Sequence, residues 1–426
     1  MTDIHLMCAA DLHLGRHVSS KEAAQPESVV IEAWKNLIDA CLQATPALDA
    51  LLLAGDLIDK DGLFLPMRGV FRQGIIKLLD QGIFVFAIAG NHDPAVLRQM
   101  EQAVGRPEFC VLGKDGCWER KSLAIRGRVL HIDALSFTET AMKKNPLESR
   151  TWEPVSPKEV LIGLLHCDVD VPESFYAPVR ASDFRGLPHL AWILGHIHIP
   201  QEIQAENPWV QYCGSLQGLD VSESGARGAW HLIIESQGNL AKKFVPLAPL
   251  QWQKITLDLS DLVLQDWENQ IVQKIEEAIV KAVGKNSSAS EIGVRLQLEG
   301  RTPLFRTLRQ NLSKLQELRE KISVGENLIA YFIESVIDKT RPELDLETLC
   351  QGSDMIAAFA RKVKQIQESQ KLSEEIVQWI EEKLSRDPFL KQCKKAWPTI
   401  AEYREIALHE GFQWLDQLLE QKQGKR

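Results

Sequence analysis

Residues 4–15 read Ile-His-Leu-Met-Cys-Ala-Ala-Asp-Leu-His-Leu-Gly, a largely apolar run that turns polar at Asp11 and His13. The run from Ile4 to Ala10 predicts a strand in a sheet that is covered on both faces. Residues two apart on an extended chain point to the same face, so Asp11 and His13 are expected to share one. This stretch therefore predicts a buried strand that ends in a pair of polar side chains.

The same arrangement recurs along the first half of the chain, where apolar runs alternate with helical patterns. Helices are expected near residues 27–44 and 70–81, and further strands at 50–54, 83–89, 160–165, 191–194 and 230–235, with shorter antiparallel strands between 109 and 134. This alternation predicts an α/β layered architecture.

Five polar segments each follow a predicted strand. They are Ala10-Asp11-Leu12-His13-Leu14-Gly15, Gly55-Asp56-Leu57-Ile58-Asp59, Gly90-Asn91-His92-Asp93, Leu165-His166 and Gly195-His196-Ile197-His198. Open α/β sheets bind ligands in the crevice outside the carboxyl ends of their strands, so the five segments are expected to converge there. The glycines before Asp56, Asn91 and His196 let the backbone turn sharply and approach the site closely.

The side chains of these segments are the donors that a pair of hard or borderline divalent metal ions requires. They offer carboxylate and amide oxygens and imidazole nitrogens, and no thiolate. With Asp11 and Asp56 as the only carboxylate ligands, two divalent ions would leave the site with about two positive charges, which favours an anionic phosphate ester. Asp93 followed by Pro94 instead predicts a helix N-cap with proline at the first helical position.

The composition is that of an ordinary globular protein. Hydrophobic residues make up 45% and charged residues 25% of the 426 residues, a length that predicts two or three domains. No apolar run approaches the roughly 20 residues that span a membrane, and the first residues lack the pattern of a signal peptide, so we expect a cytoplasmic location. The net charge of −9 counts against a protein that coats nucleic acid by bulk electrostatics. It does not exclude DNA binding through a local patch.

The pattern changes near residues 245–250, where two prolines suit a linker. We expect an α/β catalytic domain at residues 1–250, a small α/β domain at 251–340 and a helical region at 341–426. The small domain should hold strands at 254–259, 293–298 and 328–337 and helices at 267–283 and 304–322. In the helical region, apolar residues recur at helical spacing, namely Ile356, Phe359, Val363 and Ile366, and then Ile400, Tyr403, Ile406 and Ala407.

The five segments, in this order, resemble the signature of the calcineurin-type metallophosphoesterases: Asp-x-His, Gly-Asp-x-x-Asp, Gly-Asn-His-Asp/Glu, a histidine after a strand, and Gly-His-x-His. Within that superfamily the sequence is most similar to the DNA-repair exonucleases of the SbcD and YhaO type, through residues 9–15, 193–198 and 214–218, which are followed by 223–228. The resemblance is specific over residues 1 to about 250. It implies a two-sheet α/β sandwich, followed by a small capping domain and helices.

The resemblance also implies a role for each residue of the motifs. One metal ion would be held by Asp11, His13 and His198, the other by Asn91, His166 and His196, with Asp56 bridging them. His92 matches the catalytic histidine, which orients or protonates the leaving group, and Asp59 stands where many relatives hydrogen-bond that histidine. Manganese is the family's usual activating metal. Cys213 departs from the family, which often has proline there, so the shape of the Gly214-Ser215 loop stays open.

For substrate and partners, the resemblance implies exonuclease or endonuclease action on DNA ends together with a large SMC-like ATPase. Related nucleases often form homodimers. Residues 341–426 would dock the ATPase or form an extra helical subdomain on their own chain. Basic residues near the motifs are candidate phosphate contacts, namely Arg16, His17, Lys60, Lys143, Lys144, Arg180, Arg185 and Arg227. Two alternatives remain: a phosphoesterase for a nucleotide, cyclic nucleotide or phosphoprotein, and a non-catalytic adaptor that recognises DNA ends.

Overall fold

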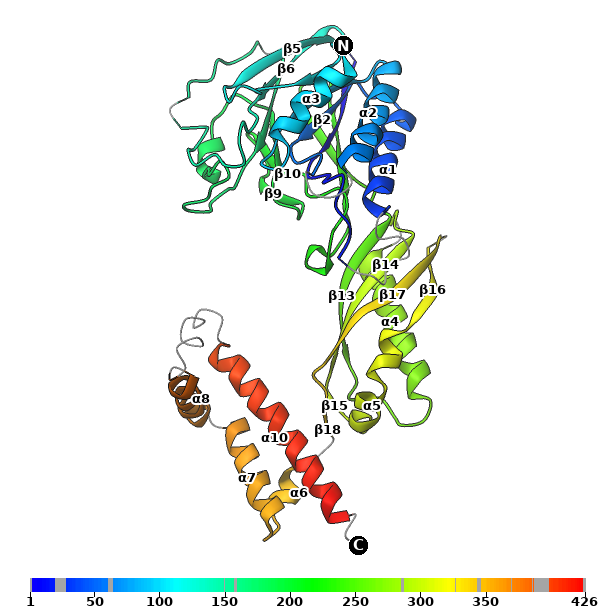
Figure 1. Ribbon diagram of the computed structural model, residues 1–426, viewed down its shortest axis with the longest axis vertical. Coiled ribbons are helices and arrows are strands. Elements are labelled where there is room, and N and C mark those ends of the chain that lie inside the picture. The colour runs from blue at the N-terminus through cyan, green and yellow to red at the C-terminus, as the bar shows by residue number, and fades with distance from the viewer. Residues whose placement is uncertain are drawn as a thin grey trace. The chain divides into compact units, whose positions relative to one another are not determined.

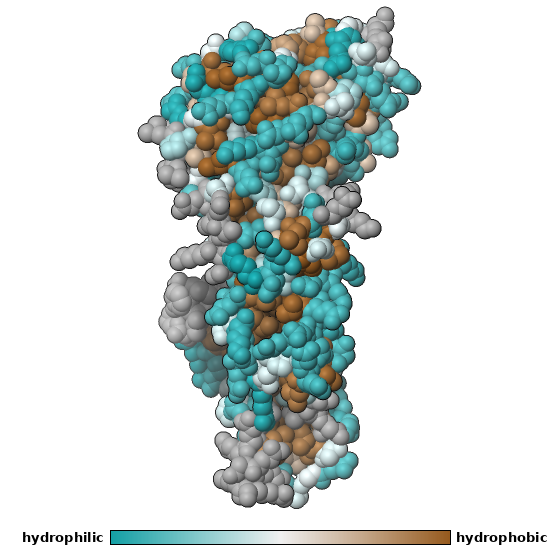
Figure 2. All heavy atoms as spheres, turned by 90° about the vertical axis from the view of Figure 1, so that its right-hand side faces the viewer, coloured by the Kyte–Doolittle hydropathy of each residue, from teal (hydrophilic) through white to brown (hydrophobic). Residues whose placement is uncertain are grey.

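The structure of the chain is a computed structural model, drawn as a ribbon in Figure 1. It describes residues 2–19, 28–59, 64–148, 150–156, 159–284, 287–325, 327–342, 346–368, 370–384, 386 and 398–423. Within these ranges, no helix is both long and apolar enough to cross a membrane. On the face drawn in Figure 2, hydrophobic residues lie in small patches among hydrophilic ones.

The chain forms two compact units. The first comprises Met1–Lys254, Ile279–Val294 and Arg319–Glu334, and the second Ile255–Ala278, Arg295–Leu318 and Ser335–Arg426. The three-part division expected at residues 250 and 340 stays a prediction.

The first sheet carries three of the five polar segments. Its six strands lie in the order β12-β11-β1-β2-β3-β4. The parallel strands are β1 (Ile4–Ala9), β2 (Ala50–Ala54), β3 (Phe84–Ile88) and β4 (Phe109–Val111), while β11 (Gly228–Ile234) is antiparallel to both β1 and β12 (Leu240–Pro246). Helices α1 (Val29–Gln43), α2 (Phe64–Asp80) and α3 (Pro94–Val104) lie beside this sheet (Figure 1).

The second sheet carries the other two polar segments. Its order is β5-β6-β7-β8-β10-β9, with β5 (Glu119–Ile125), β6 (Arg128–Ala134), β7 (Val160–His166), β8 (Ala191–Gly195), β9 (Gln201–Gln204) and β10 (Trp209–Tyr212). The strands from β6 to β10 in this order are parallel, and β5 and β9 pair antiparallel at the edges. Antiparallel pairing was expected throughout residues 109–134, but β4 is parallel to β3 because it continues the first sheet.

Alternation along β1 shows how the two sheets stack. Ile4 and Leu6 lie in a core cluster with Ile162 of the second sheet, whereas Met7 lies in another cluster with Trp34 of α1. Successive side chains of a strand point to opposite faces, so one strand contributes to both cores. Every residue of β1 is buried. The expected two-sheet α/β sandwich is confirmed.

Short turns that follow the strands bring the polar segments together. The backbone amide of Asp11 donates to the carbonyl of Gly55 at 3.0 Å, and that of His13 to the carbonyl of Asp56 at 3.0 Å. The amide of Ser215 donates to the carbonyl of His198 at 2.8 Å. These bonds join the segments after β1 and β2, and those after β8 and β10.

Residues 250–342 hold a four-stranded sheet of order β13-β14-β17-β16 and a two-stranded pair β15-β18. The strands are β13 (Leu250–Asp258), β14 (Glu291–Glu299), β15 (Arg301–Thr302), β16 (Arg319–Val324), β17 (Asn327–Asp338) and β18 (Arg341–Pro342), and the helices are α4 (Trp267–Val283) and α5 (Phe305–Gln316). The helix expected at 304–322 is therefore too long. After Gln316 the burial alternates, with Ile322 and Val324 buried and Ser323 exposed, which is the pattern of a strand.

Among the described residues after 345, the helices are α6 (Leu346–Cys350), α7 (Met355–Glu368), α8 (Gln370–Leu384) and α10 (Ile400–Gln423). Residues of α6, α7 and α10 form a core cluster. Val363 of α7 packs with Leu408 and Phe412 of α10. The buried stripe of α10 thus continues through Leu408 and Phe412, while Ile406 is 51% exposed. The expectation that Ile406 belongs to the apolar face is wrong.

Candidate metal centre

The polar segments leave their strands in a backbone conformation that few residues adopt. The φ angles of Asp11, His13 and Asp56 are 50°, 45° and 52°, and that of His196 is 99°. Residues other than glycine rarely occupy this region, and each costs roughly 1–3 kcal/mol. Four such residues come from the predicted motifs, which makes these turns a candidate functional site.

Two of the preceding glycines permit a close approach of neighbouring segments. A Cβ atom on Gly90 would lie 2.2 Å from Oδ1 of Asp56, and one on Gly195 would lie 2.0 Å from the carbonyl oxygen of Ala54. Neither position accepts a larger residue without movement of the site. The close approach expected at these glycines is confirmed.

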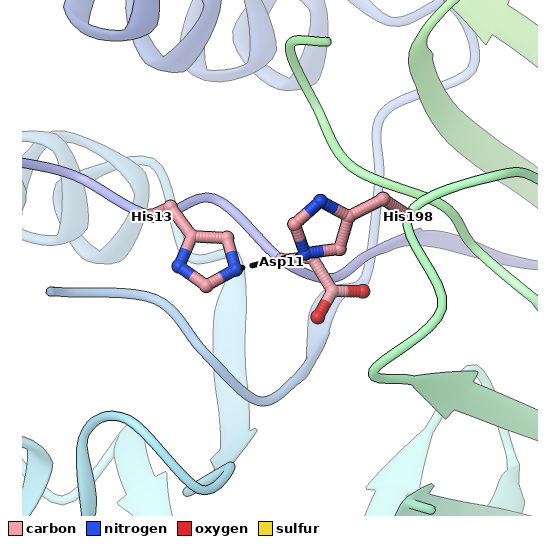
Figure 3. Close-up of side chains that lie close together, drawn as sticks. All are labelled: Asp11, His13 and His198. Atoms are coloured by element: carbon pink, nitrogen blue, oxygen red, sulfur yellow. Dashed lines mark hydrogen bonds between the residues drawn. The ribbon is translucent and has the colours of Figure 1, made fainter. Parts of the chain in front are cut away.

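Asp11, His13 and His198 form the first cluster of potential ligands. Their donor atoms lie within 4.8 Å of one another, and Figure 3 shows the three side chains gathered from two segments of the chain. The Nε2 atoms of His13 and His198 are 3.0 Å apart. Two nitrogens that bind one cation at about 2.1 Å are themselves about 3 Å apart. This spacing fits a shared cation.

Carboxylates on the far side of both rings fix which nitrogen faces the cluster. Nδ1 of His13 lies 3.2 Å from Oδ2 of Asp59, and Nδ1 of His198 lies 2.8 Å from Oε1 of Glu223. When each Nδ1 donates its hydrogen to the carboxylate, Nε2 keeps a free lone pair. Both rings are thus set up as ligands.

Asp56, His166 and His196 form the second cluster, again with donor atoms within 4.8 Å. Nε2 of His166 is 3.4 Å from Oδ2 of Asp56 and 3.1 Å from Oδ1 of Asn91. Nδ1 of His166 lies 3.0 Å from the carbonyl oxygen of Ala54, to which it can donate. The Nε2 lone pair of His166 is then directed at the cluster.

Asp56 lies between the two clusters. Its Oδ2 atom is 3.9 Å from Nε2 of His13 and 3.4 Å from Nε2 of His166. Its Oδ1 atom accepts a hydrogen bond of 2.9 Å from the backbone amide of His92. This is the position that a carboxylate needs to bridge two cations.

Without cations, the ionisable groups of this buried site are either pushed towards their neutral forms or paired with an opposite charge. Burial raises the pKa of the Asp11 carboxyl and lowers the pKa of the His13 imidazole. Burial alone would also neutralise Asp56 and His166, but their mutual attraction lowers the pKa of Asp56 and raises that of His166 to about 9. A cation at the second cluster therefore has to displace a proton from His166.

His92 and Arg16 lie beside the clusters and share the carboxylate of Asp59. Oδ2 of Asp59 is 3.4 Å from Nδ1 of His92 and accepts a hydrogen bond from Nε of Arg16. The Asp59 hydrogen bond raises the pKa of His92. The His92 side chain is 34% exposed, whereas that of Asp59 is 1% exposed. His92 is therefore the one that can reach a substrate.

Asp93 has a different role from the expected one. It does occupy the N-cap position of α3 with proline next to it, but its side chain makes no capping hydrogen bond. Instead, Oδ2 accepts from the amide of Leu57 at 2.7 Å and Oδ1 from the amide of Gly90 at 2.9 Å. Asp93 thus fastens the segments after β2 and β3 to each other.

The basic residues that were predicted to contact phosphate differ in their exposure. Arg16 lies at the edge of the site, with its side chain 35% exposed, and His17 is exposed. Arg227 is only 3% exposed, which weakens the prediction for that residue. Lys143, Lys144, Arg180 and Arg185 are exposed. Lys60 falls outside the described residues.

Two carboxylates at the site were not predicted from the sequence. Glu223 contacts His198, as described, and Oδ1 of Asp168 lies 3.3 Å from Nε2 of His196. Asp168 follows His166 by two residues, and Glu223 follows the Gly-Ser-Leu-Gln-Gly segment. These neighbourhoods were the available signal, but neither residue belongs to one of the five motifs.

Comparisons with known proteins find similarity to phosphoesterases. Residues 2–200 match the family model of the calcineurin-like phosphoesterases, and residues 252–341 match the middle domain of the metallophosphoesterase YhaO. The chain is 27% identical over 332 residues to the uncharacterized metallophosphoesterase YhaO of Bacillus subtilis, covering 74% of this chain and 78% of that protein.

Two further relatives carry the name DNA double-strand break repair protein Mre11. The chain is 28% identical over 270 residues to the protein of Aeropyrum pernix, covering 59% of this chain and 63% of that one. It is 24% identical over 317 residues to the protein of Methanopyrus kandleri, covering 66% of this chain and 64% of that one. The chain thus spans less than two thirds of either relative. Among solved structures, it is similar to a dimetal phosphatase from Danio rerio, with 12% identity, a TM-score of 0.36 and coverage of 57% of this chain and 99% of that one.

Proposed function

Residues 2–200 form a calcineurin-like phosphoesterase domain, and from that premise we propose that the chain is a two-metal phosphodiesterase that cleaves DNA. The observation that carries the proposal is the pair of ligand clusters with a carboxylate between them. One cation would be held by Asp11, His13 and His198, the other by Asn91, His166 and His196, with Asp56 bridging.

Manganese is the cation that we propose, because it is the usual activating metal of the family that the sequence resembles, and the oxygen and imidazole donors are compatible with it. When bound, a pair of such ions supplies an activated water and stabilises charge on the attacking and leaving oxygens. Asp59 and Glu223 hold the rings of His13 and His198 for this purpose. Partners of this kind fix the tautomer and orientation of a metal-binding histidine.

His92 is the proposed proton donor to the leaving oxygen. Its imidazole is partly exposed, and the hydrogen bond with Asp59 raises its pKa and so favours the protonated form. A proton donor has to lie within hydrogen-bond reach of the leaving atom and has to be charged at the working pH. Asp59 also accepts a hydrogen bond from Arg16, and this bond keeps the positive charge of the Arg16 guanidinium beside His92.

DNA is the proposed substrate, and its ends the proposed place of cleavage. Support comes from the Mre11 relatives, whose name refers to DNA double-strand break repair. It also comes from two basic residues, since Arg16 is partly exposed and Lys143 is exposed. Contacts to backbone phosphates release counterions, so binding should weaken as salt rises. We place the protein in the cytoplasm, and homodimer formation is a further proposal.

The nuclease proposal is tested with end-labelled DNA and manganese. The wild-type protein should cleave it, and His92→Ala should abolish cleavage while two metal ions remain bound. Asp56→Ala should lose both cleavage and metal, as measured by elemental analysis. His131→Ala, which changes a histidine of β6, serves as the control and should behave as wild type. Cleavage of small diesters but never of DNA would contradict the substrate, and full cleavage by His92→Ala would contradict the catalytic role.

An SMC-like ATPase is the proposed partner, docked on the C-terminal helices. These helices keep a core of their own and still expose Trp414, at 57%, on α10. An exposed aromatic side chain of this size is typical of contact residues at interfaces. Purification of native complexes should recover a large coiled-coil ATPase with this chain, and Trp414→Ala should weaken that recovery. Recovery of the chain without an ATPase would contradict the proposed partner.

A further inference from the structure

The loop between β7 and η1 (Ala181–Phe184) is strained and yet well anchored. Asp170, Glu173 and Ala177 have φ angles of 57°, 60° and 49°, a conformation that costs about 1–3 kcal/mol for each side chain other than glycine. Two backbone hydrogen bonds tie the loop to Met142, whose amide donates to Phe175 at 2.8 Å and whose carbonyl accepts from Ala177 at 2.7 Å. Such strain persists only where the surroundings enforce it.

Asp168 links this loop to the metal centre. One oxygen lies 3.3 Å from Nε2 of His196, and the other accepts a hydrogen bond from the hydroxyl of Ser174. The amide of Asp168 donates to the carbonyl of Tyr176 at 2.8 Å, and the Tyr176 ring lies 4.7 Å from the His196 ring between centroids. The loop is therefore positioned by the same carboxylate that contacts a proposed metal ligand.

The loop places two aromatic rings around a cavity that opens next to His92. The cavity has a volume of about 390 Å³, and its lining includes His92, Asn91, Phe175 and Tyr176. Volumes of about 300–1,000 Å³ are usual for small-molecule sites. Phe175 is 53% exposed, although it is one of the largest apolar side chains. A single exposed phenylalanine is unremarkable on a surface, but this one lines the cavity that holds the proposed proton donor.

The ammonium group of Lys143 lies over one face of the Phe175 ring. Nζ of Lys143 is 4.7 Å from the ring centroid, and Lys143 is itself exposed. An aromatic face combined with a neighbouring cation is the arrangement with which proteins bind unpaired nucleotides, because the base stacks on the ring and the cation meets the backbone phosphate.

We propose that Phe175 is a stacking surface for the nucleobase next to the scissile phosphate, so that the site takes an unpaired nucleotide at the point of cleavage. This inference rests on the proposed nuclease function and deepens it by naming the substrate class. A base inside a duplex cannot stack on the ring, so the nucleotide must come from a single strand or be turned out of the helix. Lys143 lies where it can contact the phosphate of an adjacent nucleotide.

The test compares pairs of single-stranded oligonucleotides. One member of each pair has a normal nucleotide at one end, and the other has an abasic tetrahydrofuran residue at that same end. The 5′ and the 3′ end are tested separately. For the wild type, kcat/KM should be higher with the base present. Phe175→Ala should reduce the ratio of the two kcat/KM values by about 5- to 100-fold, the range that stacking on one ring provides. Phe175→Trp should retain the ratio. Trp379→Ala, which removes an exposed ring of α8 that also has a lysine over it, is the matched control and should leave the ratio unchanged.

A second readout needs no turnover. Terminal 2-aminopurine should lose fluorescence when bound to the His92→Ala protein, and the added Phe175→Ala change should restore that fluorescence. The stacking proposal is overturned if the wild type cleaves DNA equally well with and without the base, or if Phe175→Ala does not change the ratio of the two kcat/KM values. Either result leaves the nuclease proposal standing. No cleavage of either oligonucleotide by the metal-loaded wild type overturns both.

Discussion

Glu223 offers the sharpest test of how the metal centre is built, because it contacts a proposed metal ligand and belongs to none of the five motifs. Its Oε1 atom lies 2.8 Å from Nδ1 of His198, and its Oε2 atom accepts from the hydroxyl of Ser215 at 3.0 Å. Burial alone would lower the pKa of His198, but the Glu223 hydrogen bond and nearby carboxylates raise it. We predict that Glu223→Ala weakens binding of the cation that His198 shares with His13.

The size of the effect follows from this one hydrogen bond. A hydrogen bond with a charged partner contributes about 1.5–3 kcal/mol, and about 1.4 kcal/mol corresponds to a tenfold change in an equilibrium constant. The side chains of His198 and Glu223 are only 23% and 13% exposed, so solvent screens the bond little. Glu223→Ala should therefore weaken one metal affinity by about 10- to 100-fold. Glu223→Gln keeps a neutral acceptor and should lose only about 3- to 10-fold.

The assay is a calorimetric titration of the metal-free protein with Mn²⁺, fitted to two sites. Only the site that includes His198 should change, and the melting temperature in the presence of chelator should stay close to that of the wild type. Glu202→Ala is the control, because this carboxylate is 45% exposed and pairs with Lys242 away from the site. Unchanged affinities in Glu223→Ala, or an equal loss at both sites together with a lower melting temperature, would refute the positioning role.

Two further substitutions test the close approach of the strand ends and the buried ion pairs. Gly90→Ala would place a Cβ atom 2.2 Å from the Asp56 carboxylate and should strongly reduce bound metal, whereas Gly69→Ala, with no atom within 4 Å, should be neutral or slightly stabilising in thermal melts. Burial alone would raise the pKa of Asp133, but hydrogen bonds from Arg120 and other groups lower it to about 2. The ionised carboxylate therefore contributes up to about 2 kcal/mol to the free energy of unfolding above pH 4. This contribution is lost as the pH falls towards 2. The difference in free energy of unfolding between wild type and Asp133→Asn, measured with denaturant, should become smaller as the pH falls from 4 to 2. A constant difference would contradict the contribution of the ionised carboxylate.

The convergence of the ligands could be predicted because each motif directly follows a strand. Parallel strands end at one edge of a sheet, so Asp11, Asp56 and Asn91 had to be neighbours once their strands were placed. The pairing of the two sheets then brings His166 and His196 to the same place. The apolar runs were enough to fix these strands, since buried strands of this kind lack polar interruptions.

The supporting residues could not be predicted in the same way. Glu223 and Asp168 act through contacts between loops, and loop conformation does not follow from hydropathy. Asp93 fits the N-cap pattern, yet its carboxylate accepts backbone amides from Leu57 and Gly90. The local pattern was right about its position and wrong about its partners, because tertiary contacts compete with the cap for the same oxygens.

Errors in the second half of the chain have a different origin. Helical spacing extended α5 to residue 322, but pairing with β17 makes residues 319–324 a strand. In α10, Ile406 fits the spacing and is nevertheless exposed, because the partner helix covers Leu408 and Phe412 instead. Periodicity indicates an amphipathic helix, whereas the face that becomes buried depends on its neighbour.

The most direct test of the metal centre is an anomalous difference map from crystals grown with Mn²⁺. We predict two peaks about 3.5–4 Å apart. One should lie among Asp11, His13 and His198 and the other next to His166, with Asp56 between them. A single peak, or two peaks away from these side chains, would contradict the two-metal site.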